Sequence, residues 1–111
     1  MLPKKNRLKK NKDFTKVIRQ GKFSHSFFLS LKEAKNDLAQ TRVGFVVSKK
    51  ISKKATVRNK IKRWLREAVR ANLDKIRSGK DIIFFTKKGI EEKKFWEIKQ
   101  AVEKLLKKGS L

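Results

Sequence analysis

The spacing of apolar residues near the start of the chain predicts a short helix. Phe14, Val17 and Ile18 recur at i, i+3 and i+4, which places them on one helix face. Asn11 is a typical N-cap residue, and Gly21 is typical of the position just after a helix ends. We therefore expect a helix between these two residues, with one apolar face turned toward the rest of the protein.

The pattern then changes to the alternation that is typical of strands. Apolar and polar residues alternate with a period of two in the segment 23–34, and the polar stretch 35–40 predicts a turn. A second alternating segment, 41–48, follows the turn, and we expect the two strands to pair antiparallel. Further along, the short apolar run 82–86 is bounded by turn residues and predicts a central strand.

Two longer helices are predicted in the second half of the chain. Residues 57–73 carry apolar side chains at helical spacing, with Thr56 as the expected N-cap, and they follow an irregular basic loop at 49–56. Residues 91–107 form the last helix, and Glu91 fits its first turn, where a negative charge is favourable. The apolar stripe of this helix consists of Phe95, Ile98, Ala101, Val102, Leu105 and Leu106.

The order of these elements indicates an α/β or α+β two-layer sandwich around one sheet. The strand at 82–86 is expected to run parallel to the strand before it, because the helix at 57–73 connects the two. Such connections are right-handed in nearly all proteins, which makes a right-handed crossover the default. No repeat or linker divides the chain, so we expect one domain, residues 1–111, with residues 1–10 as a basic and flexible lead-in.

The net charge of the chain points to a polyanionic partner. Lys and Arg number 33 against 10 Asp and Glu, a net charge of +23 that repels itself in a compact protein unless a polyanion compensates it. No segment has the roughly 20 apolar residues of a membrane-spanning helix, and no apolar stretch of a secretory signal follows the basic start. Together with the absence of Cys, these features favour a cytoplasmic protein without a membrane partner.

The helix predicted at 57–73 has separate apolar and basic faces. At about 100° per residue, one arc holds Val57, Ile61, Trp64, Leu65 and Ala68 and is expected to pack on the sheet. The opposite arc holds Asn59, Lys62, Arg63, Arg66 and Arg70, with Arg58 and Lys60 at its two margins. Arginine can hold a phosphate with two parallel hydrogen bonds, and an asparagine among arginines suits RNA or DNA better than a membrane surface. We interpret this arc as a nucleic-acid-binding face, with a merely solvated basic face as the alternative.

Residues that could carry hydrolytic chemistry in the protein itself are missing. His25 is the single histidine, has no acidic neighbour in sequence and is expected on the surface or in a turn. The carboxylates are scattered, so no cluster suits a two-metal phosphodiesterase. No Gly-rich phosphate loop or dinucleotide-binding motif is present. The sequence therefore predicts no catalytic residue, no metal site and no dinucleotide cofactor in the protein.

Several segments together resemble one family. The segment 58–67, RNKIKRWLRE, has the spacing R-N-x-x-K-R-x-x-R and resembles the signature of the bacterial ribonuclease P protein subunit. The segments 7–14 (RLKKNKDF), 42–50 (RVGFVVSKK) and 81–89 (DIIFFTKKG) are similar to other parts of that family and occur in the right order. The similarity covers nearly the whole chain, from Arg7 to Leu106.

The resemblance implies a function, its partners and a topology. Family members bind a large catalytic RNA, and the ribonucleoprotein is an endoribonuclease that removes the 5′ leader from precursor tRNA. The RNA subunit carries the Mg²⁺-dependent chemistry, so the resemblance implies no cofactor bound by the protein alone. It also implies an αβββαβα fold with a mixed central sheet and a left-handed parallel crossover through the basic helix, against the right-handed default.

The family's functional positions carry over to matching residues of this chain. The expected contacts with the RNA subunit are Arg58, Asn59, Lys62, Arg63, Arg66 and Arg70. The expected cleft for the single-stranded leader is lined by Phe14, Ile18, Phe28, Lys49 and Lys50, together with one face of the sheet. For Phe14, Phe27 and Phe28, packing in the core is the alternative to exposure in the cleft.

Two positions depart from the family pattern. Ile18 stands where an aromatic residue is common, and Ser30 or Leu31 stands where a strand tyrosine often faces the leader. Stacking of a base on an aromatic ring contributes about 1–3 kcal/mol, so this chain is expected to hold the leader more weakly. Two other functions fit the charge and size: a noncatalytic RNA-binding protein such as a ribosomal component, and a DNA-binding helix protein.

Overall fold

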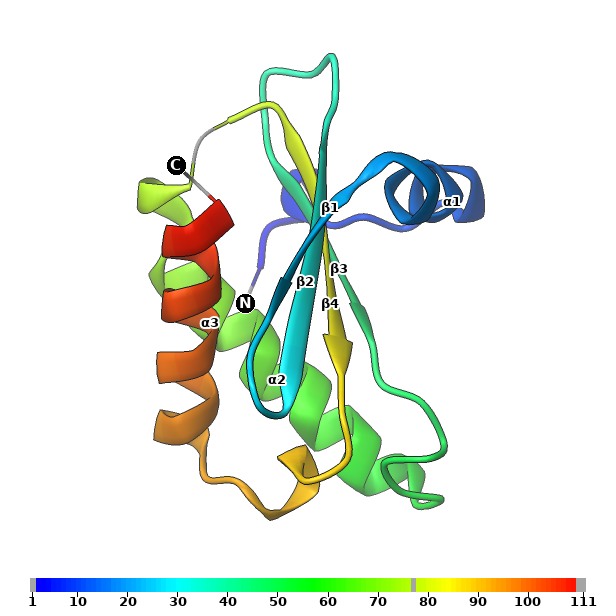
Figure 1. Ribbon diagram of the computed structural model, residues 1–111, viewed down its shortest axis with the longest axis vertical. Helices are drawn as coiled ribbons and strands as arrows, with labels where there is room; N and C mark the ends of the chain where they lie inside the picture. Colours follow the sequence, from blue (N-terminus) through cyan, green and yellow to red (C-terminus); the bar gives the residue numbers. More distant parts are fainter. Residues whose placement is uncertain (1, 77, 110–111) are drawn as a thin grey trace.

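A four-stranded sheet separates the helices into two layers. In the computed structural model, which describes residues 2–76 and 78–109, α1 lies on one face of the sheet, and α2 and α3 lie on the other (Figure 1). The helices are α1 (Asn11–Gln20), α2 (Ala55–Ala71) and α3 (Phe95–Gly109), and the strands are β1 (Lys22–His25), β2 (Leu29–Lys35), β3 (Arg42–Val46) and β4 (Lys80–Thr86). Short 3₁₀ turns occur at Lys4–Asn6, Leu73–Lys75 and Ile90–Glu92.

The order of the strands across the sheet is β1-β2-β4-β3. β1 and β4 both pair antiparallel with β2, whereas β3 and β4 pair parallel, so the αβββαβα order and the mixed sheet are confirmed. Two expectations are wrong. The segment 23–34 is not one strand, because a turn at Ser26–Phe28 divides it into β1 and β2, with the Ser26 N–H donating to the Leu29 carbonyl at 2.8 Å. β2 does not pair with β3 either, because β4 lies between them.

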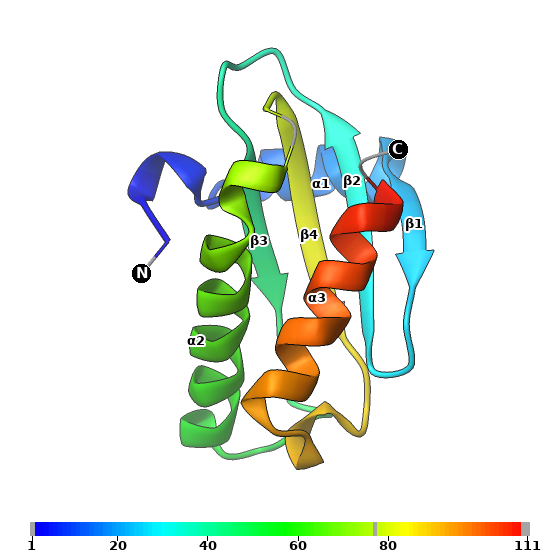
Figure 2. The same cartoon turned by 90° about the vertical axis from the view of Figure 1, so that its left-hand side faces the viewer.

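The connection from β3 through α2 to β4 is left-handed. In Figure 2, β3 points downward, α2 lies in front of the sheet, and β4 lies to the right of β3. When the view of Figure 2 is rotated so that β3 and β4 point upward and α2 stays in front, the connection runs from β3 on the right to β4 on the left. Crossovers in most proteins run to the right in this view, so the connection here has the rarer, left hand. The topology that the resemblance implied is confirmed, and the right-handed default is wrong. This hand places α2 on the face of the sheet opposite α1 (Figure 2), and β4, which lies between β2 and β3, is covered on both faces.

The side chains of β4 point alternately into two hydrophobic cores, one on each face of the sheet. Ile82 and Phe84 belong to the main core, which lies between the sheet and the helices α2 and α3. Ile83 points to the opposite face and packs with Leu8 and Val17 beneath α1 in a smaller core. β4 is therefore buried on both faces, as a central strand should be, and the prediction of its position is confirmed.

The basic lead-in packs against the edge of the sheet, although we expected it to be flexible. Leu2 and Leu8 are buried, and the Leu8 N–H donates to the Val43 carbonyl at 2.9 Å beside an isolated parallel bridge between Arg7 and Val43. The Asn6 side chain donates to the Thr41 carbonyl at 2.8 Å. The segment thus covers part of the open edge of β3 and brings its cations close to the rest of the molecule.

The helix ends differ from the predicted caps. α1 and α2 begin after Lys10 and Lys54, and neither helix has a side-chain cap, so Asn11 and Thr56 are helical residues and not N-caps. Residues 90–92 form a 3₁₀ turn, and α3 therefore begins at Phe95, where the Glu97 carboxylate accepts the Lys94 N–H at 3.0 Å. Over the described residues, no helix combines the length and the apolar character that crossing a membrane requires.

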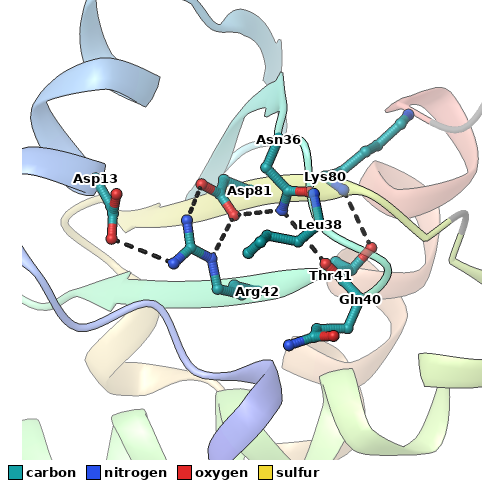
Figure 3. A network of polar contacts seen from close by, with 8 residues as sticks. All are labelled: Asp13, Asn36, Leu38, Gln40, Thr41, Arg42, Lys80 and Asp81. Carbon is teal, nitrogen blue, oxygen red and sulfur yellow. Dashed lines mark hydrogen bonds and ion pairs between the residues drawn. The ribbon is translucent and has the colours of Figure 1, made fainter.

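A buried ion pair fixes α1 on the sheet (Figure 3). Arg42 of β3 donates two hydrogen bonds to the Asp81 carboxylate of β4, at 2.9 and 2.7 Å, and a third to Asp13 of α1 at 3.2 Å. The Asn36 amide also donates to Asp81 at 2.7 Å, which leaves this carboxylate, only 3% exposed, well satisfied. The hydrogen bond and the charge of Asp81 raise the pKa of Arg42 further above its ordinary value. The network therefore sets the position of α1 and, with it, of Phe14.

Candidate nucleic-acid interface

The outer face of α2 presents cations to solvent. Asn59, Arg63 and Arg70 are exposed, and the only acidic partner in the described part of this face is Glu67, which accepts from Arg70 at 3.3 Å. This i, i+3 pair is largely exposed and contributes little to stability. Within residues 2–76 and 78–109, neither Arg63 nor Arg66 forms an ion pair with an acidic side chain. The face therefore keeps a positive charge that is available to a polyanion.

One flank of α2 borders an open cavity at the β3 edge of the sheet. Lys62 and Arg66 are half-buried there, and a cavity of about 210 Å³ lies between them and the ring of Phe14. Its lining residues are Arg7, Leu8, Lys9, Phe14, Val43, Gly44, Phe45, Lys62 and Arg66. The lining includes four cations and two aromatic rings, but no carboxylate. The basic arc of α2 and the aromatic residue of α1 therefore open onto one continuous surface.

A glycine makes room for the aromatic ring. A Cβ atom at Gly44 of β3 would lie 2.4 Å from Cζ of Phe14 and 3.3 Å from Cβ of Leu8. The Phe14 ring consequently lies directly on the backbone of β3, packed against the smaller core and open to the cavity on one side. Phe14 is thus half-buried: its ring packs against the smaller core and also lines the cavity.

The loop between β3 and α2 places further cations on the side of the sheet where α1 lies (Figure 1). Lys49 and Lys50 are exposed, and Figure 1 shows their loop on the side of the sheet where α1 lies. Arg58 of α2 donates to the Ser52 carbonyl at 2.8 Å, and Lys88 donates to the Lys50 carbonyl at 3.4 Å. Arg58, which we expected only as an RNA contact, therefore also ties this loop to the helix.

Between α1 and this loop, one face of the sheet carries an aromatic cluster that the sequence analysis missed. The Phe23 ring stacks on His25 with centroids 5.1 Å apart and lies 6.2 Å from Phe85. The Lys32 ammonium lies 4.6 Å from the centroid of Phe23. Ile18 of α1 is exposed beside this face, as expected. The alternation of residues 22–25 signals this cluster, but only once β1 is recognised as a separate strand.

Phe28 and Phe27 require correction, whereas Ser30 and Leu31 offer no ring, as expected. Phe28 does not join Phe14, because its ring packs against the main core on the opposite side of the sheet, with Lys93 5.5 Å from its centroid. Phe27 is not in the core, because it lies in the β1–β2 turn and is 97% exposed. Ser30 and Leu31 are both buried, so neither offers a ring or an open side chain in place of the tyrosine of relatives.

The apolar arc of α2 is nearly as predicted. Ile61, Leu65 and Ala68 are buried against the sheet. Trp64 is only half-buried, because it lies at the junction with α3, where it meets Phe95 edge to face at a centroid distance of 5.9 Å. The Lys60 ammonium lies 4.8 Å from the centroid of the Trp64 ring. Trp64 therefore stabilises the contact between the two helices more than the contact with the sheet.

The described residues contain no cluster of metal-ligating side chains. No group of three or more His, Cys, Asp or Glu side chains among them is placed to hold a metal ion. His25 is exposed at the end of β1, as expected. The arrangement offers cations and aromatic rings, which can bind phosphates and bases.

Comparison with known proteins identifies the family. The model of the family described as Ribonuclease P matches residues 2–110. The chain belongs to the ribonuclease P protein family. The ribonuclease P protein component of Clostridium botulinum (strain 657 / Type Ba4) is 39% identical over 109 residues, which cover 97% of each chain.

Solved structures of ribonuclease P proteins share the fold. A mutant of the Staphylococcus aureus RNase P protein superposes with a TM-score of 0.89 at 31% identity, covering 96% of this chain and 89% of that chain. The RNase P protein from Thermotoga maritima gives a TM-score of 0.84 at 35% identity, covering 92% and 96%. This chain is accordingly the protein subunit of a ribonuclease P, a tRNA-processing endoribonuclease, and it associates with the RNA subunit of that enzyme.

Proposed function

We propose that the basic arc of α2 binds the RNA subunit and that the adjoining α1 face of the sheet binds the 5′ leader of precursor tRNA. The observation that carries this proposal is the cavity shared by Phe14, Lys62 and Arg66. Because a base-stacking ring and two phosphate-binding cations line the same cavity, the two RNAs can meet on one continuous surface of the protein.

The division of residues between the two RNAs is the one that the family resemblance implies, apart from one position. Arg58, Asn59, Lys62, Arg63, Arg66 and Arg70 are assigned to the RNA subunit. Phe14, Ile18, Lys49 and Lys50 are assigned to the leader. Phe28 is withdrawn from the leader site because its ring packs on the opposite side of the sheet, and Phe23 and Phe85 replace it as stacking surfaces.

The protein's part in the reaction is binding and orientation. The Mg²⁺ used in cleavage is assigned to the RNA subunit, as the family resemblance implies. The cations bring two polyanions together and offset their mutual repulsion, while exposed rings hold unpaired leader bases. The bacterial relatives support a cytoplasmic location for this assembly.

Cleavage of precursor tRNA tests the proposal. The full-length protein is added to the RNA subunit at low Mg²⁺, where we expect the protein to stimulate removal of the leader. Arg66→Ala should weaken binding to the RNA subunit by about 1–3 kcal/mol, the contribution of a charge-assisted contact. Lys35→Ala is a matched control, because Lys35 is an exposed cation at the end of β2 that lines neither proposed surface. Equal weakening by the two substitutions, or no stimulation by the wild-type protein, would contradict the proposal.

A further inference from the structure

The β1–β2 turn exposes an aromatic ring that the fold does not use. Phe27 is 97% exposed, whereas its neighbour Phe28 packs against the main core. The turn itself is ordered by polar contacts, because the Ser26 N–H donates to the Leu29 carbonyl at 2.8 Å and Lys87 donates to the Ser26 carbonyl at 3.2 Å. Phe27 is therefore held out into solvent by a defined turn, although its ring contributes nothing to that turn.

A groove lies between this turn and α3. We call it the hairpin groove, and it is lined by His25, Ser26, Phe27, Lys104, Leu105 and Lys107. Its volume of about 670 Å³ lies in the range of sites that hold small organic ligands. Leu105 gives it an apolar floor, and the Phe27 ring forms part of its wall. The groove is thus shaped for a ligand that has a flat apolar part.

The charge around the hairpin groove selects an anion. Lys104 and Lys107 lie three residues apart on one face of α3, and the ammonium of Lys87 lies 3.5 Å from Nδ1 of His25 at the turn. None of the lining residues that the structure describes is acidic. A ligand that combines an aromatic ring with a phosphate satisfies both features, and a nucleotide of single-stranded RNA is such a ligand.

The hairpin groove lies apart from the cavity at Phe14, and it adjoins the leader surface at His25, which lines the groove and stacks on Phe23. β1 and β3 are the two outer strands of the sheet, and Figure 2 shows α3 and the β1–β2 turn toward the β1 edge, with α2 toward the β3 edge. The residues of the groove and those of the cavity at Phe14 do not overlap. A strand of RNA in the cavity at Phe14 therefore leaves the hairpin groove open.

We propose that the hairpin groove is a second site for single-stranded RNA, in which Phe27 stacks on a base and Lys104 and Lys107 bind the flanking phosphates. The protein then has a further RNA site beyond the leader surface, at the β1 edge of its sheet. Phe27 is well suited to a test, because a side chain that is almost fully exposed can be removed without loss of core packing.

The experiment uses the reconstituted ribonucleoprotein with precursor tRNA bound, so that the two surfaces already assigned are occupied. An octauridylate that carries 4-thiouridine is titrated at about 0.15 M salt and crosslinked by light, and the crosslinked peptides are mapped by mass spectrometry. We expect crosslinks in residues 25–27 and 104–107. Phe27→Ala should lower the affinity about 5- to 150-fold, which is the loss of one stacking contact.

Trp96→Ala is the matched control. Trp96 is also an exposed aromatic residue, 58% exposed on α3, but it does not line the hairpin groove. Its substitution should change the affinity by less than about twofold, well below the loss of one base stack. Exchanging both lysines for arginine should preserve binding, and exchanging both for alanine should abolish the crosslinks. The proposal is overturned if wild-type crosslinks fall outside the groove, if Phe27→Ala leaves the affinity unchanged, or if Trp96→Ala lowers it equally.

Discussion

Replacing Gly44 by alanine would place a methyl group where the Phe14 ring now lies. The added Cβ would be 2.4 Å from Cζ and 2.8 Å from Cε1 of that ring. Carbon atoms in ordinary contact are about 3.5 Å apart or more, so the ring must move by about 1.1 Å or the strand must bend. The neighbouring Leu8, whose Cβ would be 3.3 Å from the new methyl group, limits the space on the other side.

We expect this change to cost stability and to disturb the cavity together. Inserting a methyl group into a packed site typically costs about 1–3 kcal/mol. In a domain of this size each kcal/mol corresponds to a fall in Tm of roughly 4–8 °C. Because the Phe14 ring lines the cavity beside Lys62 and Arg66, its displacement should also weaken the affinity of the ribonucleoprotein for precursor tRNA.

A double-mutant cycle isolates the contact. Urea unfolding, followed by circular dichroism, gives the free energy of unfolding of Gly44→Ala in the wild-type background and in Phe14→Ala. Removing the ring should relieve the overlap, so Gly44→Ala should cost at least about 0.5 kcal/mol less in the second background. Gly89→Ala is the control, because Gly89 has a φ of 109° and no atom within 4 Å of its would-be Cβ, so its cost is independent of Phe14. An equal cost of Gly44→Ala in both backgrounds would refute the reasoning.

Four further outcomes are expected. Asp81→Asn should lower the free energy of unfolding in urea by about 3 kcal/mol, because it leaves the half-buried Arg42 without its main partner. A decrease of less than about 1 kcal/mol would show that the network does not hold α1. Trp64→Ala should lower the free energy of unfolding by about 2–4 kcal/mol, which is less than the loss expected for a fully buried tryptophan. Arg63→Ala should change the free energy of unfolding by no more than about 0.5 kcal/mol and should reduce the affinity for RNA instead. The affinity for the RNA subunit should fall steeply with salt concentration because bound counterions are released, and a flat response would contradict phosphate binding. Hydrogen bonds from the backbone N–H groups of Glu91 itself and of Gly89, together with the charge of Lys88, lower the pKa of Glu91. The ionised Glu91 carboxylate should therefore stabilise the protein fully above about pH 4.5, and this stabilisation should disappear as the pH falls through the lowered pKa. An NMR titration of Glu91 can measure that pKa.

The two-sided character of α2 was determined by its sequence alone. The arc that contains Ile61, Leu65 and Ala68 is buried and the arc that contains Arg63 is exposed, because helical geometry assigns each position to a face whatever surrounds the helix. The central place of β4 was equally predictable, since a run of apolar residues such as Ile82–Phe84 has no polar side to leave in water. The family signature lies in the same segments.

The pairing of the strands and the aromatic cluster on the α1 face of the sheet could not be predicted from the sequence. Whether the segment 23–34 is one strand or two depends on a turn that carries no Gly or Pro, and so Phe23 and Phe28 could not be assigned to faces. The starts of two helices were misplaced by one or two residues, because the prediction relied on the capping preferences of Asn11 and Thr56 and neither helix has a side-chain cap.

The sequence by itself determined the charge, the apolar stripes and the family, because these depend on residue type and on distances of only a few positions along the chain. Only the tertiary structure decided that Phe14, Gly44, Lys62 and Arg66 meet at one cavity. Their meeting depends on the hand of the β3–α2–β4 connection and on the ion pair that holds α1. Both are contacts between distant segments, and local periodicity carries no information about them.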